Sequence, residues 1–446
     1  MSRSCHTATP ITNRKIRETF TLRRATCYGG FNALSDFVRA VGVDAALTAA
    51  VGAEKAPWAT YPLPATLRHL LDGYLLGIER VWHFAHLEQE PLLCIKRDRE
   101  RLPDYTLLYR DLARFEAPGM LGRLRAVGEG LVRQALARQA WYTLDCDSTV
   151  ETVYGTQDGA RPGPNPHKRG RPSYHPLLCR ERRSGLVVNS RLRPGDTHTA
   201  TDAVEFLRQS VARLPHARRR SVLIRADRGF DTDALYATCE QRGWHYLVKL
   251  RVTANLASRI WTHAAEGRWR RLDPLEPDVG EVSEFRFQRP SWTRARRVIV
   301  TRRRDPGNRQ GHLWDAAGYN YAAYVTDLPG SAADLVACYD KRADMEKAIH
   351  ELKEDFGIDR ISCSSFGANA ADLELKILAF NLLVLYQRQA LGWTVLHRAK
   401  TVRRRVLAVA AQLIRTAGQW VLKLAGTWPG QPDVRRVRVH LATLGP

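Results

Sequence analysis

The sequence lacks a hydrophobic run long enough to cross a membrane. The longest uncharged stretch in its C-terminal half, Ile377 to Gln387, covers 11 residues, whereas a spanning helix needs about 20. The N-terminal stretch MSRSCHTATPITNRKIRE also lacks the apolar core of a secretory signal. We therefore expect no membrane association and a cytoplasmic location.

The cysteines lack any pattern that binds zinc or builds a disulfide framework. Eight of them are spread over 446 residues, with no CxxC and no Cys/His cluster at zinc-ligand spacing. We expect reduced thiols that pack as small apolar side chains. Internal repeats and low-complexity blocks are also missing, which excludes solenoid and fibrous architectures.

Acidic residues are too few to balance the basic ones. The chain has 69 Lys and Arg against 46 Asp and Glu, which gives a formal charge of +23 and a pI near 10.1. Such an excess favours a polyanionic partner. A hydrophobic share of 44% and an aromatic share of 9% are ordinary for globular proteins and exclude disorder along the whole chain.

Changes in sequence pattern divide the chain into five segments. They are 1–140 with helical periodicity, 141–250 with alternating strands and helices, 251–330 rich in strands, 331–390 helical again, and 391–446 strongly basic. The short helices of 1–140, separated by breaks such as LPD at 102–104, fit a helix-turn-helix reader of duplex DNA. Any small helical bundle has the same pattern.

The segment 141–250 predicts a mixed α/β sheet. Three strands come first, followed by a helix, a strand, a helix and a strand. Polar residues at strand ends commonly build the site of such a sheet. The segment 251–330 interrupts this pattern as an inserted β-rich unit. The tail 391–446 carries ten Lys and Arg against one acid, Asp433, and we expect it to be helical.

Three acids lie where a scaffold can hold them rigidly. Asp147 lies in the first strand of the sheet, Asp227 follows the apolar run SVLI, and Glu346 lies inside a helix expected over 332–355. Each acid alone is typical of a solvated or helix-capping residue. Together they indicate a carboxylate cluster for two divalent cations, because Mg²⁺ prefers carboxylate, water and phosphate oxygens.

The helix expected over 332–355 has well-defined ends and one polar stripe. Ser331 and Asp334 form a capping box, and Gly357 stops the helix. Four polar residues share a stripe about 60° wide beside the buried face: Tyr339, Arg342, Glu346 and Lys353. Such a group can bind a DNA strand, because the acid holds a metal ion while the cations and the phenol hold the phosphates. The alternative is an ordinary amphipathic helix with an internal Arg–Glu ion pair.

These residues resemble bacterial insertion-sequence transposases of the DDE type, which have a ribonuclease-H-like catalytic fold. The resemblance rests on DST at 147–149, on AD at 226–227, and on Tyr339, Arg342, Glu346 and Lys353 at the spacing of the Tyr-Arg-Glu-Lys signature. The stretch NPHKRGRPSYHPLL at 165–178 resembles a motif of one subgroup. The resemblance runs from about residue 28 to 390.

The resemblance implies a split ribonuclease-H-like core, 141–250 and 331–390, with a β-rich insertion between the halves. It implies that Asp147, Asp227 and Glu346 bind two Mg²⁺ ions, for which Mn²⁺ can substitute, and that Tyr339, Arg342 and Lys353 bind DNA. The implied activity is cut-and-paste transposition with excision through a hairpin. The implied partners are terminal inverted repeats and target DNA, held by a homodimer at the bacterial nucleoid.

Several assignments stay open on the sequence alone. Asp145 and Asp147 have the same strand parity and face the same side, so spacing does not separate them. An aromatic residue that receives a flipped base is another feature of the family. The candidates are Trp261, Trp269, Trp292 and Trp314, and each is also a plausible core residue.

Basic side chains outside the helix form the last group of candidates. Lys168, Arg169 and Arg171 lie in a Gly/Pro-rich loop, where we expect them to bind DNA phosphates. Arg218–Arg220 precede the Asp227 strand, and we expect the same role for them, although a charge run by itself is typical of a solvated face. Arg403–Arg405 and Arg435–Arg438 fit this role or a surface for a second element end or for target DNA. Two rival functions remain, an endonuclease that never joins ends and an inactive DNA-binding protein derived from a transposase.

Overall fold

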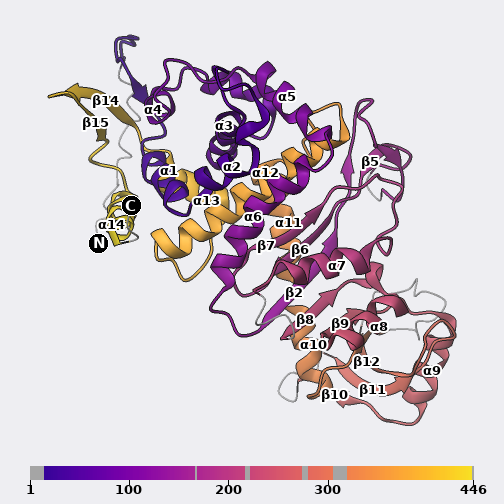
Figure 1. Ribbon diagram of the computed structural model, residues 1–446. Coiled ribbons are helices and arrows are strands. Elements are labelled where there is room, and N and C mark those ends of the chain that lie inside the picture. The colour runs from indigo at the N-terminus through magenta and orange to yellow at the C-terminus, as the bar shows by residue number, and fades with distance from the viewer. Residues whose placement is uncertain (1–14, 166–167, 216–220, 274–279, 305–318, 444–446) are drawn as a thin grey trace, which may run out of the picture.

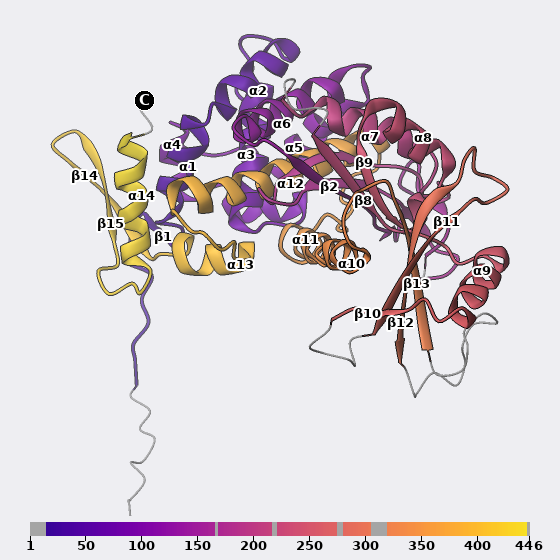
Figure 2. The same cartoon turned by 90° about the horizontal axis from the view of Figure 1, so that it is seen from below.

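A nine-stranded mixed sheet forms the centre of the computed structural model, which describes residues 15–165, 168–215, 221–273, 280–304 and 319–443. The strand order is β10-β11-β12-β13-β9-β8-β2-β6-β7. Helices α7 and α8 lie on one face of the sheet, and α10 and α11 lie on the other (Figures 1 and 2).

Five strands of the segment 141–250 make one end of this sheet. They are β2 (Tyr142–Ser148), β6 (Leu177–Glu181), β7 (Val187–Arg191), β8 (Val222–Ala226) and β9 (His245–Lys249), with α7 (Ala203–Ala212) and α8 (Asp233–Arg242) between them. β2, β8 and β9 are parallel, whereas β6 and β7 form antiparallel pairs. The predicted α/β class is confirmed, and this order agrees with a ribonuclease-H-like core.

β8, in the middle of the parallel strands, is largely apolar because both of its faces are covered. All five residues of β8 are buried. Leu223 packs with Leu335 of α10, whereas Ile224 belongs to the large cluster that includes Leu235 of α8. A smaller sheet lies beside the core and consists of β3 (Glu151–Thr152), β4 (Arg161–Pro162) and β5 (Pro172–Tyr174).

The β-rich segment 251–330 extends the central sheet. Its elements are α9 (Ala254–Ala265), β10 (Arg270–Arg271), β11 (Glu281–Phe287), β12 (Arg296–Arg304) and β13 (Tyr319–Thr326). β13 pairs antiparallel with β9, where Val325 lies opposite Val248. The sheet therefore continues from the core into the insertion. The sequence pattern did not reveal helix α9.

The prediction of one helix over 332–355 is wrong in one respect, because the segment forms two helices. These are α10 (Ala332–Asp340), capped by Ser331, and α11 (Ala343–Phe356), which ends at Gly357. Gly357 adopts a left-handed conformation with φ of 62°, as expected of a C-terminal cap. The break coincides with Arg342, whose side chain contacts β2. Helical periodicity contains no information about such a tertiary contact.

The N-terminal helices and the last core helix share one hydrophobic core. The N-terminal helices are α1 (Phe31–Ala40), α2 (Val43–Val51), α3 (Leu63–Leu76), α4 (Pro91–Lys96), α5 (Tyr105–Ala113) and α6 (Met120–Leu136). Helix α12 (Phe366–Leu385) packs against α3, α5 and α6 and is buried along almost its whole length. Tyr74 of α3 donates a hydrogen bond to Asp372 of α12, and Lys376 pairs with Asp372 at 2.8 Å.

The basic tail contains helices, as expected, and also a hairpin that its charge pattern did not predict. The tail elements are α13 (Ala399–Val402), β14 (Ala411–Thr416), β15 (Gln419–Leu424) and α14 (Gln431–Thr443). β1 (Ala25–Thr26) pairs with β14, so an N-terminal segment joins the tail in one small sheet. None of the described helices is long and apolar enough to cross a membrane. The seven cysteines of the described part are free thiols.

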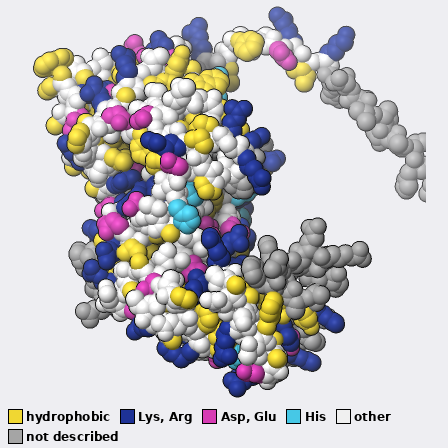
Figure 3. All heavy atoms as spheres, turned by 90° about the vertical axis from the view of Figure 1, so that its right-hand side faces the viewer, with side chains coloured by type: hydrophobic (Ala, Val, Ile, Leu, Met, Phe, Trp, Pro, Cys, Tyr) yellow, Lys and Arg dark blue, Asp and Glu magenta, His cyan; other side chains and the backbone are white. Residues whose placement is uncertain are grey.

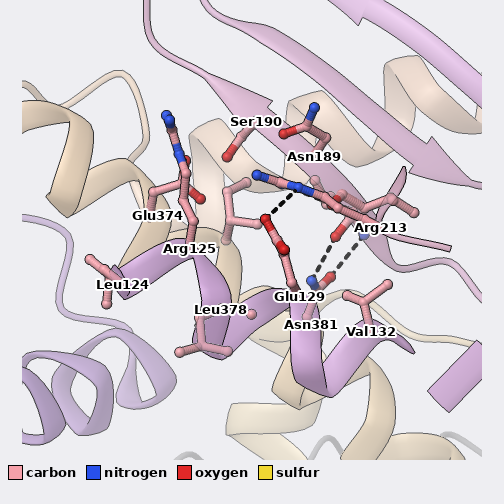
Figure 4. A pocket seen from close by; sticks show the side chains of 14 residues that line it. Leu124, Arg125, Glu129, Val132, Asn189, Ser190, Arg213, Glu374, Leu378 and Asn381 are labelled. Carbon is pink, nitrogen blue, oxygen red and sulfur yellow. Dashed lines mark hydrogen bonds and ion pairs between the residues drawn. The ribbon is translucent and has the colours of Figure 1, made fainter. Parts of the chain in front are cut away.

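Asn381 covers the outer edge of the central sheet. Its side-chain oxygen accepts from the Val187 amide at 2.8 Å, and its amide nitrogen donates to the Val187 carbonyl at 2.8 Å. Arg213 donates to the carbonyl of Val188 at 3.1 Å and pairs with Glu129 at 2.9 Å, beside a cavity of about 20 Å³ (Figure 4). These side chains satisfy backbone groups that an edge strand otherwise leaves unpaired.

We expect Asn381→Leu to lower the free energy of unfolding by about 2–4 kcal/mol, because both Val187 groups stay buried without a partner. Urea denaturation of the full chain measures this change. The control Gln134→Ala removes an exposed amide from α6 and should change stability by less than about 0.5 kcal/mol. An Asn381→Leu protein as stable as this control would show that the contact to the edge strand contributes nothing.

Glu151 of β3 is a buried acid. Its side chain is 1% exposed, and neither carboxylate oxygen has a hydrogen-bond partner among the described residues. Burial raises the pKa of Glu151 to about 8, although the nearby Lys353 ammonium opposes this shift. The folded protein therefore holds this proton at pH values where the unfolded chain has released it.

Stability should consequently fall as the pH rises from about 5 to about 8, since the folded-state pKa of Glu151 lies above its unfolded value. Glu151→Gln removes this titration. Over this pH range, we expect the free energy of unfolding of the wild type to fall by on the order of 3 kcal/mol more than that of the variant. Urea denaturation measures both values. Parallel pH profiles for the two proteins would mean that Glu151 titrates normally.

Candidate active site

Two carboxylates meet where neighbouring parallel strands end. Asp147 is the penultimate residue of β2, and Asp227 directly follows β8. Cys146 lies opposite Ala226 in the parallel ladder, so the next residue of each strand leaves the sheet beside the other. The strand-end rule for α/β sheets thus brings the two predicted aspartates together.

The Asp147 carboxylate lies in a buried and strongly charged environment. It pairs with the Arg342 guanidinium at 2.8 Å and accepts from the Ser148 amide at 2.8 Å. Burial raises the pKa of Asp147 to about 6; Asp227 adds to this shift, and Arg342 opposes it. A carboxylate of this kind gains from a nearby cation, because the cation favours its charged form.

Glu346 reaches the same cleft from helix α11. Its side chain is 72% exposed and lies 3.8 Å from Arg342, which therefore stands between Glu346 and Asp147. All three predicted carboxylates line one open cleft of about 530 Å³. The residues that line this carboxylate cleft are Asp147, Asp227, Arg228, Lys249, Tyr339, Asp340, Arg342, Ala343 and Glu346.

The other residues of the predicted stripe point from the helices toward β2 and β8. The buried Tyr339 hydroxyl donates to the Ala226 carbonyl at 3.3 Å, and burial raises its pKa. Arg342 donates to the Cys146 carbonyl at 3.1 Å. Lys353 donates to the Val150 carbonyl at 3.1 Å, away from the residues that line the cleft. Tyr339 and Arg342 therefore lie at the predicted site, and Lys353 supports the adjoining loop.

Asp145 has a different environment from Asp147. Its two carboxylate oxygens accept from the Arg225 guanidinium at 2.7 and 2.8 Å, and both side chains are almost completely buried. Asp145 is not among the residues that line the cleft. The structure thus separates the two aspartates that strand parity left equivalent.

The basic loop residues lie apart from the carboxylates. Lys168, Arg169 and Arg171 are exposed in the connection between β4 and β5, and none of them lines the cleft. The Arg171 guanidinium lies 6.0 Å from the ring centroid of Tyr154. Lys and Arg side chains are also spread over the face of the molecule in Figure 3. The run Arg218–Arg220 lies outside the described residues.

Sequence reasoning missed two cations of the cleft. Arg228 follows Asp227 directly, and Lys249 is the last residue of β9. Lys249 ends the third parallel strand, so the rule that indicated the aspartates applies to it equally. Together with Arg342 they bring positive charge to a cleft that four acids also line, Asp147, Asp227, Asp340 and Glu346.

The four tryptophan candidates have different surroundings. Trp261 of α9 is 43% exposed and lines a cleft that shares Arg228 and Lys249 with the carboxylate cleft. Trp292 is buried, and the ring of Trp269 lies 4.4 Å from the Arg302 guanidinium. Trp314 lies outside the described residues. Trp261 therefore lines a cleft that adjoins the predicted site.

The carboxylate cleft fits a hard divalent cation by the chemistry of its donors. Asp147, Asp227 and Glu346 offer only oxygen ligands. Burial and the negative charge of Asp227 raise the pKa of Asp147, so a bound cation would stabilise its charged form. Within the described ranges, no group of three or more His, Cys, Asp and Glu side chains is close enough together to hold a metal ion.

Comparison with known proteins identifies the family. No curated protein matches this sequence. Among solved structures, the cryo-EM structure of a piggyBac transposase synaptic complex with hairpin DNA matches 84% of this chain and 79% of that chain, with 12% identity and a TM-score of 0.44. The family described as Transposase DDE domain group 1 matches residues 8–446. The chain therefore belongs to this family and is a DNA transposase, an enzyme that cuts DNA and transfers strands.

Proposed function

We propose that this transposase performs its chemistry in the carboxylate cleft, with Asp147, Asp227 and Glu346 as its catalytic residues. The observation that carries the proposal is the convergence of three acids, from β2, β8 and α11, on one open cleft. The reaction is cut-and-paste transposition of a bacterial insertion sequence. It consists of hydrolysis at the terminal inverted repeats followed by transfer of the freed 3′ end.

Transposases of the DDE type use divalent metal ions, and we propose two Mg²⁺ ions here, with Mn²⁺ as a substitute. Bound by the three acids, they would activate water or a DNA 3′-hydroxyl and stabilise the leaving oxygen. Arg342 holds Asp147 in place and reduces the repulsion between the aspartates. Because Arg342 directly precedes α11, which carries Glu346, the same contact positions Glu346 above the strand ends.

The cations of the cleft bind the phosphates of the DNA strand. Arg228 and Lys249 line the cleft beside the acids, where they neutralise phosphates of the bound strand. Tyr339 and Arg342 fix the geometry of this surface through their contacts with β8 and β2, and Lys353 holds the loop that follows β2 at Val150. Lys168, Arg169 and Arg171 bind phosphates farther along the duplex. Trp261 offers a stacking surface for an unpaired base in the adjoining cleft.

The substrate is DNA, and we propose that it comprises both the terminal inverted repeats and the target duplex. A homodimer would bring two element ends together, since each transposition event joins both ends to one target. The formal charge of +23 favours binding of the protein to DNA. We place this reaction at the nucleoid, in the bacterial cytoplasm.

We expect Asp227→Ala and Glu346→Ala each to reduce DNA cutting by at least about 10³-fold, because each removes a carboxylate from the proposed metal site. Binding of the same DNA should change by less than about threefold. The assay incubates the full chain with Mg²⁺ and a duplex that ends in the DNA flanking its gene, and maps the products. Glu354→Ala, an exposed acid of the same helix, is the matched control and should cut normally.

The products separate the proposed function from its rivals. Cutting followed by joining of the 3′ end to a target duplex supports transposition. Metal-dependent cutting without joining indicates an endonuclease. Binding without cutting, identical in wild type and in both acid variants, indicates an inactive DNA-binding protein. Cutting by the Glu346→Ala or Asp227→Ala protein at the wild-type rate would contradict the assignment of the three acids.

The Mg²⁺ requirement should depend on pH through Asp147. Burial raises the pKa of Asp147 to about 6, and a protonated carboxyl does not bind the metal. Below about pH 6, the half-saturating Mg²⁺ concentration should therefore rise about tenfold for each pH unit. Initial cutting rates in Mg²⁺ titrations between pH 5 and 8, with DNA already bound, measure this change. A half-saturating concentration that stays constant from pH 7 to pH 5 would contradict the role of Asp147.

A further inference from the structure

The hairpin β14–β15 is a ribbon that is fixed at its base and free at its tip. At the base, β1 pairs with β14, Leu413 donates its amide to the Arg24 carbonyl at 3.0 Å, and Ala425 donates to Ala410 at 2.9 Å. Leu413 is buried. Beyond this base the strands extend outward beside α14, away from the central sheet (Figures 1 and 2).

The tip of the ribbon is narrow. Ala417 and Gly418 connect the strands and have φ angles of 49° and 79°, which is the two-residue turn that matches the twist of a tight hairpin. A left-handed conformation is unfavourable for alanine. The chain nevertheless adopts it here, which keeps the tip only two residues long. Such a ribbon has the dimensions of the DNA major groove, which is about 12 Å wide.

The two faces of the ribbon differ in composition. Directly opposed residues share a face, and the inner face consists of Ala411 with Leu424, Leu413 with Leu422 and Arg415 with Trp420. The outer face consists of Gln412 with Lys423, Ile414 with Val421 and Thr416 with Gln419. The inner face packs at its base on the protein. The outer face combines hydrogen-bonding side chains with β-branched apolar ones.

The ribbon itself carries cations and no acid. Between Glu374 and Asp433 the sequence contains no acid at all. The guanidinium of Arg24 lies 4.9 Å and that of Arg415 6.0 Å from the Trp420 ring centroid, so both stack at the tip. Asp433 is already paired with Arg405 at 2.8 Å. The cations of the ribbon therefore remain available to a polyanion.

We propose that the outer face of the β14–β15 ribbon enters the major groove of duplex DNA. Gln419 and Lys423 donate hydrogen bonds to base edges, while Ile414 and Val421 contact thymine methyl groups. Arg24 and Arg415 hold the flanking phosphates. The ribbon is thus a DNA-binding surface separate from the carboxylate cleft. It depends on the proposed function only in that both surfaces bind the same DNA.

A second copy of the chain is the other occupant to consider. Among the described strands β15 ends its sheet, and its residues Trp420, Val421 and Leu424 are 41%, 40% and 39% exposed. Pairing two β15 edges would bring the cations of two ribbons together without any acid to compensate. Trp420 is also covered in part by the two arginines. Charge complementarity therefore favours DNA.

The test measures DNA binding by fluorescence anisotropy of the full chain in EDTA, so that its result does not depend on cutting. The first probe is a duplex of the DNA that flanks the gene, and the second is a random duplex of equal length. Replacing Arg415→Ala together with Lys423→Ala should weaken binding to both probes at least about tenfold. The slope of log K against log salt should fall by about two units.

The matched control carries Arg39→Ala and Arg110→Ala, which removes the same charge from exposed helix positions and should bind like wild type.

A second variant, Gln419→Ala with Val421→Ala, should bring the affinities for the two probes closer together, because it removes contacts to the bases in the groove. Thermal denaturation verifies folding. Wild-type affinity and salt slope in the Arg415/Lys423 variant would overturn the proposal. So would a change from dimer to monomer in light scattering with unaltered DNA binding, which would make the ribbon an interface between copies.

Discussion

The ion pair between Arg342 and Asp147 is the contact on which the arrangement of the site depends. Both side chains are largely buried, and Arg342 also donates to the Cys146 carbonyl on the same strand. Removing one partner of such a pair leaves an uncompensated charge, which costs about 3–5 kcal/mol. The pair therefore joins the start of α11 firmly to β2. Glu346, one turn farther along α11, takes its position from this contact.

The elements that hold the site are rigid for reasons that lie outside it. β8 and β9 are interior strands, since the insertion continues the sheet through β13 and β6 covers the other side of β2. Helix α12 is buried among α3, α5 and α6, and Lys376 on it donates to the Gly357 carbonyl at the end of α11. The acids on β2, β8 and α11 consequently lie on well-packed elements, which suits chemistry that needs fixed distances.

The sequence predicted those parts of the site that follow from local pattern. Apolar runs identified β2 and β8, and the strand-end rule then indicated Asp147 and Asp227. Helical periodicity placed Glu346 beside the buried face. Local pattern did not separate Asp145 from Asp147, because the choice depends on Arg225 from a neighbouring strand.

Tertiary contacts account for the other differences between expectation and structure. The break at Arg342 and the hydrogen bonds of Asn381 both join segments that are distant in sequence. The tail hairpin was missed because neither of its strands, AQLIRT and QWVLKL, alternates apolar and polar residues, which is the local signal of a strand.

A ribbon that binds DNA away from the cleft would change what the cleft itself must do. Two linked contacts raise the effective concentration at the second site to about millimolar, so the cleft needs only weak affinity of its own. Weak affinity for DNA is what we expect of a cleft that contains several acids. Arg342 neutralises Asp147, but Asp227 and Glu346 repel the phosphates of DNA. Separate surfaces for holding and cutting would also let a cut end stay bound until a target duplex arrives, which is the order of steps that strand transfer requires.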